Sequence, residues 1–130
     1  MATSIANPSS EKSRSDRSLQ LALAAAQTAA DNNGRDIRIL DVRKMTQLFD
    51  YLVIASGTSR RHLHAISEEI DHKLEDDLDD KRMSIEGYRE SRWIILDYGS
   101  VVIHMFEPET RDFYRLEDLW GDAPQVPFGK

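Results

Sequence analysis

The stretch WIILDYGSVVIHMF, Trp93–Phe106, reads as two apolar strands joined by a tight polar turn. The turn, Asp97-Tyr98-Gly99-Ser100, places an aromatic ring and a carboxylate at the tip of a hairpin, where burial in a core is difficult. We therefore expect an exposed Tyr98 beside Asp97. Such a pair is more typical of a protein-binding surface than of a catalytic pocket, because aromatic side chains bury much area at little rotamer cost.

Three further segments complete the predicted sheet. Tyr51–Ala55, YLVIA, is almost continuously apolar and predicts a central strand covered on both faces. Asp36–Val42 predicts a first strand, and a short strand is expected around Ile85. With the two hairpin strands, these give a mixed sheet of about five strands. A long helix after Ala55 supplies the crossover that a parallel pair of strands requires.

Apolar periodicity predicts two main helices. The first runs from about Ser18 to Asn32, and its expected buried stripe is Leu19, Leu23, Ala26 and Ala30. The second runs from about Ser59 to Asp79, and its expected stripe is Leu63, Ile66, Ile70, Leu74 and Leu78. Short helical turns are expected near residues 110–114 and 116–120. The predicted fold is a single α/β domain, a mixed sheet flanked by helices.

Composition indicates the limits of the domain and the kinds of partner that it can bind. Residues 1–17 are polar and predict a disordered tail, residues 18–124 form the domain, and residues 125–130 form a C-terminal tail. The chain has no cysteine, which excludes disulfides, thiol catalysis and cysteine-ligated zinc. No apolar run is long enough to cross a membrane and no secretory signal is evident, so we expect a cytoplasmic protein. The alternative is an organelle-targeted homologue, because residues 1–18 are Ser-rich and contain Arg, although Glu11 and Asp16 weigh against a transit peptide. The net charge of −6 argues against direct sequence-specific nucleic acid binding and suits a basic protein partner.

The turn Ser56-Gly57-Thr58-Ser59 lies between the central strand and the second helix. Its backbone amides could hold an anion, although it lacks the lysine and the spacing of a P-loop, so an ordinary capped turn is favoured. The alternative function is therefore a nucleotide-binding or nucleotidyltransferase-type enzyme that uses this turn. Nucleotidyltransferases need closely spaced carboxylates for two magnesium ions, whereas Asp97 and Glu107 stand at opposite ends of the hairpin strands. We expect no catalysis, cofactor or metal.

Histidines and acidic residues have simpler interpretations. His64, Glu68 and His72 recur at helical spacing, but a solvated charged face is favoured over a metal site. His104 is expected to be a hydrogen-bonded or interface histidine. The segment Glu107–Asp122 interleaves acids with aromatic residues. It either closes the open side of the sheet or, beside the hairpin, forms a surface for a basic protein.

The chain resembles the bacterial ribosomal silencing factors, also called Iojap-related proteins. The resemblance rests on the combination of DYLVIASGTSRRH, WIILDYGSVVIHMF and RDFYRLEDLW, and it covers about residues 18–124. It implies an α/β sheet related to the nucleotidyltransferases but without their catalytic carboxylates. It also implies a translation repressor that binds the large ribosomal subunit through its ribosomal protein number fourteen. Such a repressor sterically blocks joining of the small subunit and lowers protein synthesis under nutrient limitation.

The resemblance also implies which residues meet the partner. The family's binding surface corresponds first to Trp93, Leu96, Asp97 and Tyr98. Second-tier candidates are His104, Phe106 and the segment Arg111–Trp120, in particular Tyr114 and Trp120. Strand alternation points Trp93 and Ile95 to one face and Leu96 to the other, so not all of these residues can meet the partner. We further expect a weak homodimer at most, since an apolar face that meets a partner is often covered by a second copy in its absence.

Overall fold

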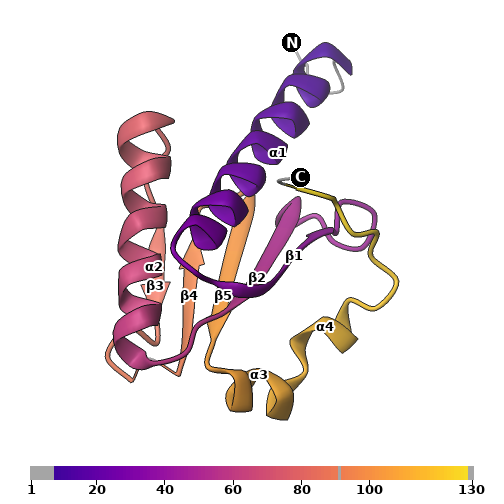
Figure 1. Ribbon diagram of the computed structural model, residues 1–130. Helices are drawn as coiled ribbons and strands as arrows, with labels where there is room; N and C mark the ends of the chain where they lie inside the picture. Colours follow the sequence, from indigo (N-terminus) through magenta and orange to yellow (C-terminus); the bar gives the residue numbers. More distant parts are fainter. Residues whose placement is uncertain (1–7, 91, 129–130) are drawn as a thin grey trace.

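Five strands form one mixed sheet in the computed structural model, which describes residues 8–90 and 92–128 (Figure 1). The strands are β1 (Arg35–Asp41), β2 (Tyr51–Ser56), β3 (Ser84–Glu86), β4 (Trp93–Asp97) and β5 (Val101–Phe106). Their order across the sheet is β1-β2-β5-β4-β3. β2 and β5 are parallel and the other neighbours are antiparallel. The predicted α/β class, the number of strands and the parallel pair are confirmed.

Two long helices cover one face of this sheet. They are α1 (Pro8–Asp31) and α2 (Arg60–His72), and α2 continues into a π-helical turn at Lys73–Asp77 (Figure 1). The buried apolar side chains of α2 and its extension are those the periodicity predicted, with Leu78 partly buried; they are Leu63, Ile66, Ile70 and Leu74. They pack on every second residue of the strands, on Val53, Ile94, Leu96, Ile103 and Met105 among others. This layer holds most of the hydrophobic core.

Helix α1 differs from the prediction in two ways. It begins at Pro8, so residues 8–17 are helical where a disordered tail was expected, and residues 1–7 lie outside the described part. The residues that α1 buries also differ from the predicted stripe; they are Ser18, Leu21, Ala22, Ala25, Ala26 and Ala29. The predicted leucines, Leu19 and Leu23, are only partly buried at its margins. Small alanines face the sheet because they let the helix backbone approach it closely.

The C-terminal part of the chain covers one half of the opposite sheet face. Helices α3 (Pro108–Tyr114) and α4 (Leu116–Leu119) lead into an extended segment. Leu116 and Ala123 pack there on the side chains of β1, β2 and β5, namely Leu40, Leu52, Ile54 and Phe106. On the other half of this face, formed by β4 and its border with β5, α3 reaches Trp93 through the Tyr114 ring, and the side chains farther along the two strands remain partly exposed.

The extended C-terminal segment also protects the free edge of β1. The Asp41 amide donates to the Pro124 carbonyl oxygen at 2.9 Å, and the Val126 amide donates to the Ile39 carbonyl oxygen at 2.8 Å. Val126 and Phe128 then pack against the helix-covered core. The chain from Gln125 to Phe128 therefore belongs to the domain, which corrects the expectation of a separate tail. Pairing an edge strand in this way removes a template for unwanted association.

Candidate protein-binding face

The β4–β5 hairpin presents a row of partly exposed side chains on the sheet face that α1 and α2 leave free. We call this row the open face, and it consists of Trp93, Ile95, Asp97, Val102 and His104. Strand pairing sets Ile95 opposite His104 and Asp97 opposite Val102, so these side chains lie on one side of the sheet. Ile95 and Val102 were not predicted as site residues, although alternation from Trp93 already indicated the side on which Ile95 lies.

Trp93 is held rigidly at one end of the open face. Its ring stacks on Phe106 with 4.7 Å between ring centroids, and it lies 4.9 Å from the Tyr114 ring of α3. Its Nε1 donates a hydrogen bond to Nδ1 of His104 at 2.9 Å. The prediction that His104 is a hydrogen-bonded histidine is confirmed. Aromatic rings fixed in this way offer area to a partner at little further entropic cost.

Burial of His104 makes folding sensitive to pH. Burial lowers the pKa of His104 from 6.5 to about 4, because it disfavours the imidazolium form. Between these values the unfolded chain binds a proton that the folded chain does not. The free energy of unfolding therefore falls as pH falls through this window, by roughly 3 kcal/mol in total. Urea unfolding at pH 7 and pH 4.5 should show this loss, and His104→Gln should show a smaller one. An equal loss in both proteins would assign the effect to other groups.

Asp97 shapes the hairpin turn as well as the open face. Its Oδ1 accepts a hydrogen bond from the Gly99 amide at 2.8 Å, and Gly99 has a φ of +86° that favours glycine. The carboxylate remains partly exposed beside Val102. Trp93 lies at one end of the open face, and Asp97 offers a negative charge at the other end.

Tyr98 lies on the other side of the hairpin, and the expectation of an exposed ring is wrong. Its side chain is 4% exposed and belongs to the helix-covered core. Its hydroxyl donates to Oδ1 of Asp71 on α2 at 2.9 Å, and Asp71 also pairs with Arg82 at 3.2 Å. Burial raises the pKa of Tyr98. The ring follows the alternation of Ile94 and Leu96, so it anchors the turn to α2.

The other site candidates lie at different depths. Leu96 and Phe106 are fully buried. Leu96 lies in the helix-covered core, and Phe106 lies on the opposite face of the sheet, stacked against Trp93. Tyr114 is 55% exposed, and Trp120 is partly buried in an edge-on contact with Phe49, 5.8 Å between centroids. The most exposed apolar side chains of α3 and α4 are Phe113 and Leu119, which lie within the candidate segment Arg111–Trp120.

The turn at residues 56–59 uses its polar groups internally. The Gly57 amide donates to the Phe106 carbonyl oxygen at 2.9 Å, and the Thr58 amide donates to Nδ1 of His62 at 2.9 Å. Ser59 caps α2 by accepting from the His62 amide at 3.1 Å. These amides are not available to a phosphate group. The geometry therefore favours the capped turn over a nucleotide site.

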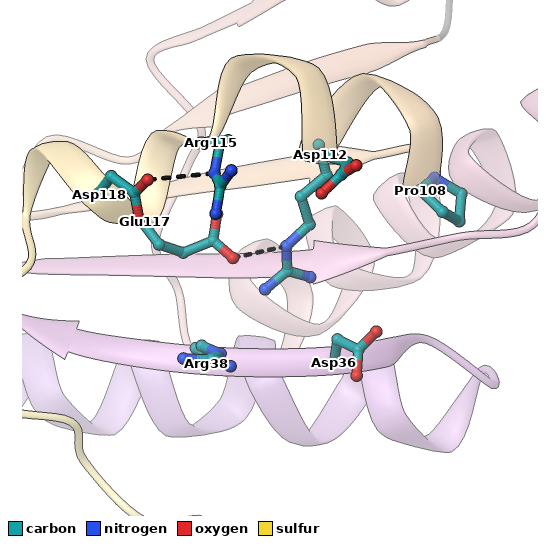
Figure 2. Close-up of a pocket in the computed structure, with 8 residues that line it drawn as sticks. Asp36, Arg38, Pro108, Asp112, Arg115, Glu117 and Asp118 are labelled. Carbon is teal, nitrogen blue, oxygen red and sulfur yellow. Dashed lines mark hydrogen bonds and ion pairs between the residues drawn. The ribbon is translucent and has the colours of Figure 1, made fainter.

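A charged cavity of about 430 Å³ lies next to this turn, between the start of β1 and helices α3 and α4 (Figure 2). Arg111 crosses it and binds Oγ of Ser56 at 2.7 Å and Oε2 of Glu117 at 2.8 Å. Burial alone would raise the pKa of Glu117, but hydrogen bonds from its own backbone amide and from Arg111 leave that pKa below its usual value. Arg115 pairs with Asp118 at 3.2 Å. Two of the three arginines in this cavity are thus neutralised by carboxylates.

Helix α2 shows no metal site either. His64 stacks on Tyr88 with 4.0 Å between ring centroids, and His72 lies 2.6 Å from the Asp76 carboxylate. Within residues 8–90 and 92–128, no three histidine, aspartate or glutamate side chains gather closely enough to hold a metal ion. In the same part of the chain, no helix is both long and apolar enough to cross a membrane.

In this α/β domain, the open face remains partly exposed and carries a fixed aromatic side chain. Such a surface is typical of a protein that binds another protein. Comparison with known protein families identifies the family of this domain. The family model described as "Ribosomal silencing factor during starvation" matches residues 15–130. The chain belongs to this family, as the sequence motifs predicted.

Individual relatives agree with this assignment. The ribosomal silencing factor of Bacillus subtilis is 41% identical over 101 residues, which cover 77% of this chain and 84% of that protein. The chloroplastic protein Iojap of Arabidopsis thaliana is 32% identical over 127 residues, 95% of this chain and 51% of that protein. A crystal structure of a Chromobacterium violaceum protein superposes with a TM-score of 0.76 at 31% identity and covers 86% of this chain and 92% of its own.

Proposed function

We propose that this protein represses translation in the cytoplasm by binding the large ribosomal subunit through its ribosomal protein number fourteen. The bound protein then blocks joining of the small subunit. Membership of the silencing family carries this proposal, because the match spans residues 15–130 and so includes the whole open face. The mechanism is steric and needs no catalysis.

The chemistry of the open face and its surroundings supports a basic partner. Trp93, Tyr114 and Phe113 offer apolar area at one end. Glu90 and Glu109 line the same surface hollow as these rings, together with Arg92. Ribosomal proteins are commonly basic, so charge complementarity steers the encounter while the aromatic centre supplies affinity. The net charge of −6 acts in the same direction.

Ile95→Glu tests this surface directly. Ile95 is partly exposed at the centre of the open face, so the added carboxylate can stay hydrated in the free protein but not under a partner. We expect the variant to fold and to lose co-sedimentation with purified large subunits, by about 100-fold in affinity. The matched control is Ala65→Glu, which adds the same charge to the exposed side of α2.

The same preparation tests the mechanism. Large subunits loaded with the wild-type protein should fail to join small subunits in a sucrose gradient, and those mixed with Ile95→Glu should join normally. Wild-type binding without a block of joining would contradict the steric mechanism alone. Equal loss of binding in Ile95→Glu and Ala65→Glu would instead remove the open face from the interface.

A further inference from the structure

The hydrogen bond between Trp93 and His104 fixes which nitrogen of His104 carries the proton. Nδ1 accepts from Nε1 of Trp93 at 2.9 Å, so it has no proton of its own. A neutral imidazole carries one proton, and it must then sit on Nε2. The ring is kept neutral by burial, which lowers the pKa of His104 to about 4.

Within residues 8–90 and 92–128, no hydrogen-bond partner reaches Nε2 of His104. Among the described residues, every fully buried side-chain nitrogen or oxygen has a hydrogen-bond partner, so an unpartnered Nε2 must be reached by solvent. The indole N–H of Trp93 is already used by His104, so Nε2–H is the donor that the Trp93–His104 pair presents outward.

The surroundings of this donor are apolar. His104 stands in register with Ile95 on β4 and with Ile54 on β2, and the Trp93 ring lies beside it at 5.9 Å between centroids. A partner that covers these groups also removes water from Nε2–H. A donor that loses water must gain an acceptor, or the complex is weakened.

We propose that Nε2–H of His104 determines the specificity of the open face by requiring a carbonyl oxygen of the partner protein at this point. This inference rests on the proposed function. The lysine and arginine side chains of a basic partner carry only donors, so they cannot satisfy Nε2–H. They are directed to Asp97 and the carboxylates of α3, while a main-chain or side-chain carbonyl must meet His104.

Two substitutions separate the donor from the shape of the ring. His104→Gln keeps an acceptor for Trp93 and an outward N–H, whereas His104→Leu fills the space and removes both. We expect His104→Leu to bind purified large subunits about 10–100-fold more weakly than the wild type, and His104→Gln to stay within about threefold. The unfolding midpoint of each variant, by urea denaturation, shows that the comparison is made on folded protein.

Nitrogen NMR of the free protein tests the tautomer independently of the ribosome. The His104 ring, assigned by its absence from His104→Gln, should show a protonated Nε2 and a bare Nδ1 at pH 7. A protonated Nδ1 would overturn the inference even if the protein binds large subunits. So would binding of His104→Leu that equals the wild type. Failure of the wild type to bind would overturn the proposed function, and this inference with it.

Discussion

Gly87→Ala is expected to destabilise the fold by about 3–5 kcal/mol and to abolish large-subunit binding at 37 °C. Gly87 joins β3 to the loop before β4 with a φ of +77°, a conformation that an L-residue adopts only with strain. A Cβ at this position would lie 2.0 Å from the carbonyl oxygen of Trp93. Backbone cannot yield as a flexible side chain can, so the first residue of β4 must move. Urea unfolding monitored by circular dichroism measures the loss.

Gly121→Ala is the matched control for this substitution. Its φ is not positive, and an added Cβ would meet its nearest neighbour, the Asp118 carbonyl oxygen, at an ordinary 3.5 Å. We expect a change within about 0.5 kcal/mol. Similar losses in the two variants would mean that any added methyl group is harmful in this chain, and would contradict the role given to the Gly87 conformation.

Arg111→Met is expected to lower the free energy of unfolding by about 2–4 kcal/mol, because it leaves the buried Ser56 hydroxyl and the partly buried Glu117 carboxylate without their donor. Arg111 is 8% exposed and ties Ser56 at the end of β2 to Glu117 at the start of α4. Methionine fills similar space but offers no donor to the Glu117 carboxylate. Helices α3 and α4 should detach from the sheet before the rest of the protein unfolds. Hydrogen exchange of the α3 and α4 amides, together with urea unfolding, measures both effects.

Arg115→Met provides the comparison on the same two helices. Arg115 pairs with Asp118 at 3.2 Å, but the two side chains are 68% and 69% exposed. Exposed ion pairs contribute little, so a change within about 0.5 kcal/mol is expected. If Arg115→Met were as costly as Arg111→Met, burial would not be what makes Arg111 important.

The sheet could be predicted from the sequence because its strands are short apolar runs with clear ends. Tyr51–Ala55 and Trp93–Phe106 each specify their own strands, and the helix between them specifies the parallel pairing. The start of α1 could not be predicted in this way. Residues 8–17 are polar on every side, and Figure 1 shows this end of α1 projecting past the sheet, where no apolar stripe is needed.

The site was harder to predict than the fold, because its decisive contacts join residues that are distant in sequence. Tyr98 looked exposed at a polar turn, yet Asp71 of α2 supplies the acceptor that makes its burial possible. The pairing of Trp93 with His104 is diagonal across the hairpin, since Trp93 stands opposite Phe106. Alternation alone separates the two faces of β4, and it correctly indicated that Trp93 and Leu96 point in opposite directions.

The position of β5 determines when the sheet can form during synthesis. β5 is central in the sheet, between β2 and β4, and the segment that covers β1 includes Gln125 and Val126. During synthesis, the strands made earlier have no central neighbour until β5 leaves the exit tunnel. The edge of β1 likewise stays unpaired until Gln125 and Val126 have left the tunnel. The open face, which β4 and β5 form together, therefore cannot assemble on the nascent chain before β5 has emerged.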